Sequence, residues 1–218
     1  SMGVVERNAG GGERVMLIVR GIRLDIGENE KKLPTLAAKR LGVRREDIRD
    51  FKIVRRSLDA RRKSDIHYLY SVAVSLRADE GRVLSRARGD CAEYVPFRYE
   101  IPRAKSAKRP VVAGFGPAGM FAALVLARAG LRPIVLERGE AADARRESVR
   151  RFWETGELDP ESNVQFGEGG AGTFSDGKLN TGTRDARISW VLETLARHGA
   201  PERVTYDAKP HVGTDVLH

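Results

Sequence analysis

The sequence predicts an α/β protein in two parts, a small α+β domain of βαββ type followed by an incomplete parallel βαβ fold. Charge divides the chain, because residues 1–110 hold 26 Lys and Arg against 15 Asp and Glu, net +11, whereas residues 111–218 hold 13 against 15. Apolar residues partly alternate with polar ones in the first part and form short continuous runs in the second. The two parts therefore differ in chemistry as well as in fold.

Composition restricts the class of protein. The chain has 218 residues, of which 41% are hydrophobic and 32% charged, and no apolar run approaches the ~20 residues that span a bilayer. Its one cysteine, Cys91, excludes an internal disulfide and a CxxC motif. We expect a soluble, cytoplasmic protein without membrane contact, and a flexible leader or tag remnant at residues 1–14.

The first domain is expected over residues 15–78. Residues 16–24 are apolar and β-branched with partial alternation, which predicts a strand. Asn29 is placed to cap a helix whose apolar residues recur between Leu33 and Leu41, and Gly42 supplies its end. Two more strands are predicted, over residues 51–54 and 67–76.

The segments around these strands are basic and polar. The connection over residues 55–63 holds five positive charges. Residues 79–109 are predicted to form a linker, with one short strand around Tyr94–Tyr99. We place Cys91 in this linker as an ordinary thiol.

The second domain is expected over residues 110–218. Residues 111–113 and 134–136 predict two buried parallel strands, joined by an apolar helix over residues 120–129. Further helices are predicted over residues 141–155 and 185–198, and a glycine-dense loop over residues 167–182.

A G-x-G-x-x-G motif lies between the first of these strands and its helix, at Gly114, Gly116 and Gly119 with Pro117 and Ala118 inside it. Gly114 permits the tight turn, Gly116 lets a pyrophosphate approach the backbone, and Gly119 lets helix and strand pack closely. Glu137 follows the second strand, 18 residues after the last glycine, where its carboxylate can bind both hydroxyls of an adenosine ribose. The context, rather than the motif alone, predicts a dinucleotide site.

The stretch VVAGFGPAGMFAALVLARAGLRPIVLERG resembles the first βαβ unit of FAD-binding oxidoreductases of the glutathione-reductase-like superfamily. Residues 163–182, NVQFGEGGAGTFSDGKLNTG, resemble a signature of bacterial FAD-dependent dehydrogenases that carry a small basic N-terminal domain. The resemblance implies the N-terminal portion of such a protein, with an incomplete Rossmann-like FAD/NAD(P)-binding domain.

The resemblance also implies cofactors and site residues. FAD would carry the hydride chemistry, with NAD(P)H as a plausible reductant and a small molecule as substrate. The cofactor-binding residues would be Gly114, Gly116, Pro117, Ala118, Gly119, Glu137, Arg138, Gly169, Gly170, Gly172, Thr173, Ser175 and Lys178. Gly169, Gly170 and Gly172 expose successive N–H groups that can form an anion-binding concavity. No cysteine pair follows the glycines, which disfavours disulfide reduction.

Other assignments stay open. Arg145 and Arg146 are near enough to the ribose-binding strand to reach a phosphate, although a solvated helix face is the favoured interpretation. Phe152 and Trp153 are assigned to the core. The four histidines show no ligand spacing, so no metal site is predicted. The sequence identifies no catalytic acid or base.

The basic domain leaves a second class of function open. This alternative is an NAD(P)-binding Rossmann protein whose residues 15–78 bind RNA or another polyanion through the basic loop, with Tyr68 and Tyr70 as stacking faces. Against it, both tyrosines share a strand face with Val72 and Val74, which indicates a core face. Nucleic acid is therefore the minority interpretation, and the sequence does not determine the oligomeric state.

Overall fold

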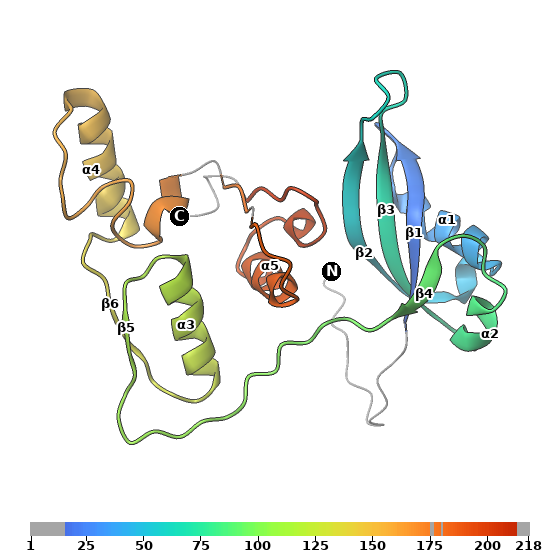
Figure 1. Ribbon diagram of the computed structural model, residues 1–218, viewed down its shortest axis with the longest axis horizontal. Coiled ribbons are helices and arrows are strands. Elements are labelled where there is room, and N and C mark those ends of the chain that lie inside the picture. The colour runs from blue at the N-terminus through green and yellow to red at the C-terminus, as the bar shows by residue number, and fades with distance from the viewer. Residues whose placement is uncertain (1–15, 175–176, 180, 213–218) are drawn as a thin grey trace. The chain divides into compact units, whose positions relative to one another are not determined.

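The computed structural model describes residues 16–174, 177–179 and 181–212. It divides the chain into two compact units, an N-terminal unit that ends at Pro96 and a C-terminal unit that begins at Phe97. The expected leader at residues 1–14 and the predicted site residue Ser175 lie outside the described residues. Each unit is described by itself below (Figure 1).

The N-terminal unit is a four-stranded antiparallel sheet in the order β2-β3-β1-β4. Its elements follow in the order β-α-β-β-α-β, which together with this strand order gives a ferredoxin-like arrangement. The bounds of the elements are β1 (Met16–Asp25), α1 (Leu33–Leu41), β2 (Ile48–Asp59), β3 (His67–Leu76), α2 (Glu80–Leu84) and β4 (Cys91–Tyr94).

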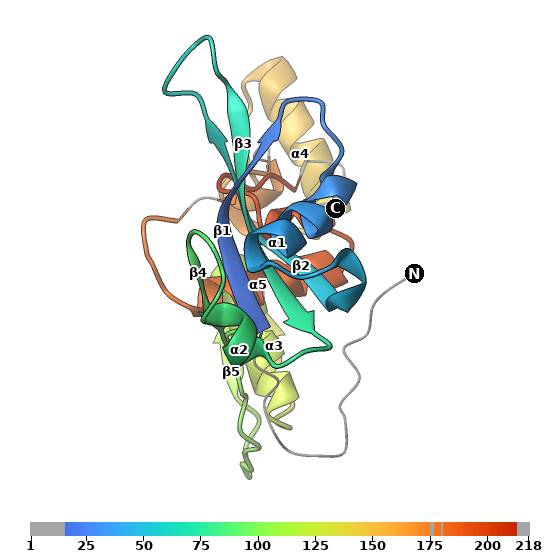
Figure 2. The ribbon, with the colours of Figure 1, turned by 90° about the vertical axis from the view of Figure 1, so that its right-hand side faces the viewer.

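Apolar burial holds this unit together. One face of the sheet packs against α1 and α2, as Figures 1 and 2 show, and the core between them is fully enclosed. The buried residues are Leu17, Val19, Ile22, Leu24, Leu33, Ala37, Ala38, Leu41, Ile48, Tyr70, Val72, Val74 and Leu76. The predicted core face of the third strand is confirmed, because Tyr70, Val72 and Val74 are buried and Tyr68 packs against them.

The partial alternation of the first strand has a structural cause. Leu17 and Val19 face the core, and so do Ile22 and Leu24, which differ from them in parity along the chain. The pairing of β1 with β3 shifts between Val19 and Ile22, so that a bulge restores the inward face. The bulge thus explains a pattern that simple alternation does not.

Helix α1 begins and ends where the sequence predicts. The Asn29 side chain accepts a hydrogen bond from the N–H of Lys31 at 2.9 Å and opens a short 3₁₀ turn that leads into the helix. Gly42 ends the helix in a left-handed conformation, with φ of 68°.

Two predictions for this unit need correction. The second strand is longer than expected, because Arg55 and Arg56 continue the pairing with β3 and only residues 60–66 form the connection. Arg56 reaches Glu30 at 3.1 Å and lies over the Tyr68 ring, so its charge is neutralised within the strand region. The range 79–109, expected as a linker, holds α2 and β4, and Cys91 lies on β4 half-buried against the core rather than in a loop.

The C-terminal unit contains a parallel two-stranded sheet, β5 (Val111–Ala113) and β6 (Ile134–Leu136), joined through helix α3 (Pro117–Arg128). Two longer helices follow, α4 (Ala142–Thr155) and α5 (Arg187–Arg197), with short 3₁₀ turns at Gly170–Phe174 and Glu202–Thr205. The chain is therefore a mixed α/β protein with an antiparallel and a small parallel sheet.

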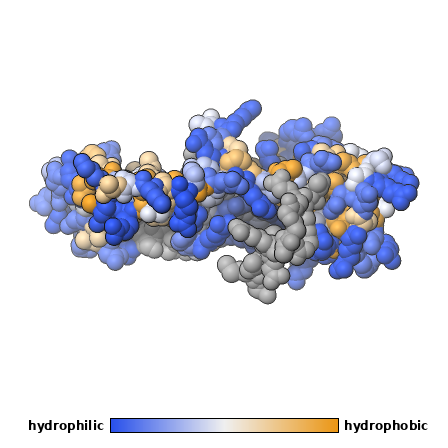
Figure 3. All heavy atoms as spheres, turned by 90° about the horizontal axis from the view of Figure 1, so that it is seen from below, coloured by the Kyte–Doolittle hydropathy of each residue, from blue (hydrophilic) through white to orange (hydrophobic). Residues whose placement is uncertain are grey.

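Apolar packing is sparse in this unit. Val149 is buried, but Trp153 is 68% exposed, which contradicts its assignment to the core. An aromatic cluster joins α5 to α3 and to residue Tyr99, with the Trp190 ring 5.0 Å from Tyr99 and 5.6 Å from Phe121. No helix in the described part of the chain is long and apolar enough to cross a membrane. The face in Figure 3 is largely hydrophilic, with scattered apolar patches.

Candidate functional site

The glycine turn forms the floor of the site. Gly114 has φ of 90°, a backbone conformation that side chains other than glycine rarely adopt. A Cβ on Gly119 would lie 2.0 Å from the carbonyl oxygen of Gly114, so only glycine allows α3 to approach the end of β5 this closely. Gly116 is different, since a Cβ there would have no heavy atom nearer than 3.8 Å.

The beginning of α3 offers unused hydrogen-bond donors. The N–H groups of Gly116, Ala118 and Gly119 have no acceptor among the described residues, as is usual for the first turn of a helix. The positive end of the helix dipole adds to these donors. This end of α3 therefore favours a negatively charged group.

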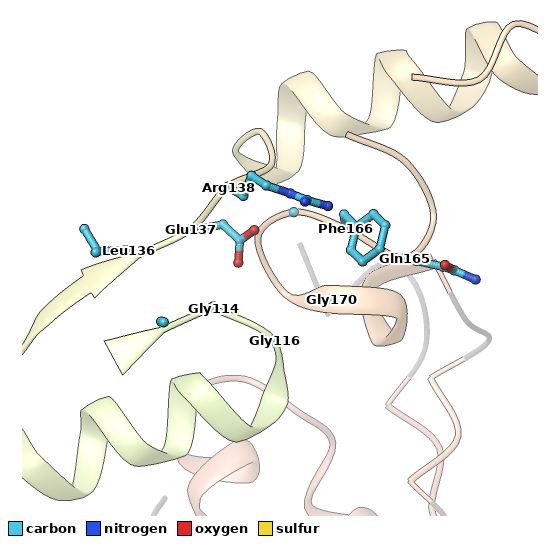
Figure 4. A pocket seen from close by; sticks show the side chains of 10 residues that line it. Gly114, Gly116, Leu136, Glu137, Arg138, Gln165, Phe166 and Gly170 are labelled. Atoms are coloured by element: carbon cyan, nitrogen blue, oxygen red, sulfur yellow. The ribbon is translucent and has the colours of Figure 1, made fainter. Parts of the chain in front are cut away.

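Glu137 directly follows β6, and its carboxylate lies beside the glycine turn. Its carboxylate accepts hydrogen bonds from the N–H of Gly139 at 2.9 Å and of Phe115 at 2.6 Å. These bonds lower the pKa of Glu137 and outweigh the opposing effect of burial. An ionised, oriented carboxylate thus lies beside the turn (Figure 4).

A pocket of about 690 Å³ opens between the glycine turn, Glu137 and the loop that follows α4. This volume is typical of a site for a small molecule or part of a cofactor. Its lining residues are Ala113, Gly114, Gly116, Leu136, Glu137, Arg138, Gln165, Phe166, Gly167 and Gly170. The pocket thus lies at the carboxyl ends of both parallel strands, where α/β sheets bind ligands.

Arg138 and Phe166 form one wall of the pocket. The Arg138 guanidinium lies 4.7 Å from the centre of the Phe166 ring and pairs with Glu161 at 2.9 Å. Figure 4 shows the two side chains reaching toward each other from β6 and from the loop. They give the wall a flat, partly cationic surface.

The loop over residues 163–170 is a second wall with its own hydrogen-bond network. The Asn163 side chain accepts from the N–H groups of Gln165 and Phe166, and Glu168 accepts from the N–H of Ala142 at the start of α4. Glu140 accepts from the Ser148 and Ser162 hydroxyls. The loop is thus tied to α4 by polar contacts.

Within the described part of the chain, the predicted site residues divide into two groups. Gly114, Gly116, Glu137, Arg138 and Gly170 line the pocket. Thr173 is buried with its hydroxyl on the Glu168 carbonyl, and Lys178 is exposed and pairs by its backbone with His211. Those that do not line the pocket are Pro117, Ala118, Gly119, Gly169, Gly172, Thr173 and Lys178.

The expected anion-binding concavity at Gly169 and Gly170 needs correction. The N–H of Gly169 donates to the carbonyl of Phe115 at 2.9 Å, and the N–H of Gly170 donates to the carbonyl of Gly167 at 3.0 Å. Both donors are therefore used to hold the loop, whereas those in the first turn of α3 are unused.

Sequence reasoning missed or misplaced three features of this site. Arg145 is completely buried rather than solvated, whereas Arg146 is exposed and lies 3.8 Å from Asp143. Gln165 and Phe166 line the pocket. Both belong to the glycine-rich motif found in the sequence, but only the folded loop shows that they face the pocket.

No group of three His, Cys, Asp or Glu residues arranged to hold a metal is found where the structure describes the chain.

In the N-terminal unit, the structure bears on the RNA-binding alternative at two tyrosines. Tyr68 and Tyr70, the expected stacking faces for RNA, face the core, and the Tyr70 hydroxyl donates to Glu30 at 2.8 Å. Burial, followed by this bond, raises the pKa of Tyr70. The stacking role is thus excluded for these two rings.

Comparison with known proteins gives two findings. Residues 16–75 match a domain of unknown function (DUF8436), which covers β1 to β3 of the N-terminal unit. The chain is 48% identical over 204 residues to a protein of Clostridium beijerinckii, printed as "Uncharacterized protein". The match covers 91% of this chain but 38% of that relative, so the chain spans well under half of the relative's length.

Proposed function

We propose that the chain is the N-terminal part of an FAD-dependent oxidoreductase, a dehydrogenase, whose C-terminal unit is the first portion of a Rossmann-like FAD-binding domain. The pocket carries this proposal, because Gly114 and Gly116 of the glycine turn line it together with Glu137, beside the first turn of α3 and its free donors. These are the groups that an adenosine diphosphate requires. The length of the relative supports the expectation that a longer chain completes the domain.

The residues fit the cofactor where its phosphates and ribose would lie. Gly116 has no Cβ, which leaves space at the pocket floor. The N–H groups of Ala118 and Gly119, in the first turn of α3, have no acceptor among the described residues. Glu137 would accept hydrogen bonds from the two ribose hydroxyls, using oxygen lone pairs that the Phe115 and Gly139 N–H groups leave free. When bound, FAD supplies the hydride transfer at its N5 position, and NAD(P)H is the proposed reductant.

The charge of Glu137 defines which nucleotide the pocket accepts. An ionised carboxylate binds a free 2′-hydroxyl and repels a 2′-phosphate. We therefore expect the pocket to prefer FAD, or ADP as its fragment, over NADP. This preference separates the proposal from an NADP-binding protein, and binding of FAD itself separates it from an NAD-binding one.

Flavin titration tests the proposal. The longer protein and this chain are each titrated with FAD, with flavin fluorescence as the measurement, and ADP and 2′-phospho-ADP compete. We expect saturable FAD binding that ADP displaces and 2′-phospho-ADP does not. A longer protein that is colourless and does not bind FAD, but binds NADP, would overturn the proposal.

Gly116→Val tests whether the pocket floor binds the cofactor. Gly116 has φ of −75°, which valine adopts, and a Cβ there would meet only Cα of Gly170, at 3.8 Å, so the fold should persist while the side chain occupies the pocket floor. We expect FAD affinity to fall more than about 100-fold, or about 2.7 kcal/mol. Gly182→Val, at an exposed glycine outside the pocket, is the control and should bind FAD normally.

A further inference from the structure

Arg145, on the first turns of α4, is a buried cation that the proposed function does not use. Its side chain is 0% exposed. Its guanidinium donates to four backbone carbonyls, at Asn163 (2.8 Å), Val164 (2.8 Å), Glu168 (2.6 Å) and Gly170 (2.8 Å). All four belong to the loop that forms a wall of the pocket.

The arginine is held without an ion pair. No carboxylate within the described ranges bonds to it, although buried arginines are ordinarily paired with one. The four carbonyl dipoles take the place of a carboxylate. The Phe174 ring, with its centre 4.7 Å from Cζ of Arg145, covers the guanidinium. A charge this costly to bury needs every one of these contacts.

Hydrogen bonds lead from Arg145 to the glycine turn. The peptide that joins Glu168 to Gly169 accepts from Arg145 through its carbonyl and donates through its N–H to Phe115 at 2.9 Å. Carbonyl and N–H of a trans peptide point in opposite directions, so one planar group bridges the arginine and the turn. Phe115 in turn donates its N–H to Glu137 at 2.6 Å.

Steric contacts reinforce this link. A Cβ on Gly167 would lie 2.5 Å from Cδ of Arg145, so the loop backbone rests directly on the arginine stem. Gly170 lies close to the glycine turn, since a Cβ there would meet Cα of Gly116 and Cδ of Pro117 at 3.2 Å. The loop is packed between Arg145 and the turn.

We propose that Arg145 is a positioning residue that fixes the 163–170 loop against the glycine turn and so preforms the nucleotide pocket. The identity of the nucleotide rests on the proposed function, but the preformed wall does not. Arg145 does not line the pocket, and it acts through the Glu168–Gly169 peptide and Gly170. Its loss would separate the wall from the turn while leaving Glu137 and α3 in place.

Hydrogen exchange without nucleotide tests the positioning. Arg145→Met keeps most of the stem and removes the four donors, and Arg146→Met, at the exposed neighbour, is the matched control. We expect the Gly169 and Phe115 amides to exchange at least about tenfold faster in Arg145→Met and unchanged in Arg146→Met. Unchanged exchange in Arg145→Met would overturn the proposal whether or not the protein binds FAD.

A rescue experiment separates positioning from general stability. Arg145→Ala leaves a cavity shaped for a guanidinium, so millimolar, non-denaturing guanidinium chloride should restore slow exchange at Gly169, and sodium chloride at the same concentration should not. Arg145→Lys keeps the charge but reaches fewer carbonyls, so it should retain wild-type Trp190 emission while Gly169 protection is lost. If Arg145→Lys matches the wild type in both readouts, the charge alone suffices and the positioning role is wrong.

FAD affinity provides the last readout. If the proposed function holds, Arg145→Met should bind FAD about tenfold to 100-fold more weakly, with Trp190 emission retained. If the wild type binds no FAD while the exchange result is as expected, the proposed function fails and the positioning role stands. The two proposals can therefore fail independently.

Discussion

The two units of this chain are stabilised in different ways. Of the buried apolar residues in the described part of the chain, fifteen belong to the N-terminal unit and five to the C-terminal unit. Six of the seven buried polar or charged residues belong to the C-terminal unit, with Ser75 the exception. One unit thus depends on apolar burial, and the other on hydrogen bonds around a buried arginine.

This difference matches the place of the proposed nucleotide site, which lies in the C-terminal unit. The ferredoxin-like sheet packs its core against its own helices. In the C-terminal unit, Val111 is 58% and Leu136 56% exposed, although parallel strands are normally covered on both faces. Under the proposed function, further chain would cover these strands, and the nucleotide would add stability there by mass action.

The largest effect is expected in the N-terminal core. Leu33→Ala removes a side chain that is 0% exposed at the start of α1, and the resulting cavity should cost about 2 to 5 kcal/mol. Both tryptophans lie in the C-terminal unit, so their emission reports on that unit alone. We expect hydrogen exchange to accelerate in β1 and β3 while Trp190 emission stays unchanged. A simultaneous loss of Trp190 packing would show that the units are not independent.

A comparable effect is expected in the C-terminal unit from a single methyl group. Gly119→Ala places a Cβ 2.0 Å from the Gly114 carbonyl, so α3 must move away from β5, at a cost of about 3 kcal/mol. Chemical denaturation followed by tryptophan emission measures the loss, and Gly182→Ala, in open space, is the control. A Gly119→Ala protein as stable as the control would show that the close approach is unnecessary.

Local signals predicted more of this fold than long-range ones. The glycine turn and Glu137 were found from the sequence because their spacing encodes a strand, a turn and a helix within one short segment. Helix α2 was missed, and the short strand expected around Tyr94–Tyr99 lies earlier, at Cys91–Tyr94, because these elements are only five and four residues long and β4 pairs with β1, far away in sequence. A short strand whose partner is distant leaves little periodicity to detect.

Arg145 shows why part of the site could not be predicted. Its neighbours in sequence are charged, so solvation was the reasonable expectation. Its partners are backbone carbonyls of residues 163–170, and a carbonyl leaves no trace in the residue type. The exposure of Trp153 was also missed. Helical spacing indicates which residues share a face, but not whether another element covers that face.

A smaller effect is expected from pH. Because Gly139 and Phe115 donate to Glu137, its pKa in the folded protein is lower than the 4.5 of an ordinary glutamate. The resulting stability is fully present above about pH 4.5 and is lost as the pH falls through the lower, folded pKa. Solvent screening keeps the effect at about 0.5 to 1 kcal/mol.

Denaturation of Glu137→Gln followed by Trp190 emission between about pH 3 and pH 7 measures this contribution. The variant should lose stability near neutral pH and show a flatter acid dependence than the wild type. Glu157→Gln, at an exposed glutamate of the same unit, should retain the wild-type profile. A Glu137→Gln profile that parallels the wild type would show that the two backbone bonds contribute no differential protonation.

The smallest effect is expected from Arg150, one and a half turns beyond Arg145 on the same helix. Arg150 is 56% exposed and pairs with Glu147 and, at 2.7 Å, with Glu154. Because water solvates all three charges, Arg150→Gln should change the free energy of unfolding by less than about 0.5 kcal/mol, and less still in high salt. Arg145→Met, by contrast, should be as costly in high salt as in low salt, because its partners are buried carbonyls rather than screened charges. Equal salt dependence in the two variants, measured by denaturation, would remove the distinction between a structural arginine and a surface one.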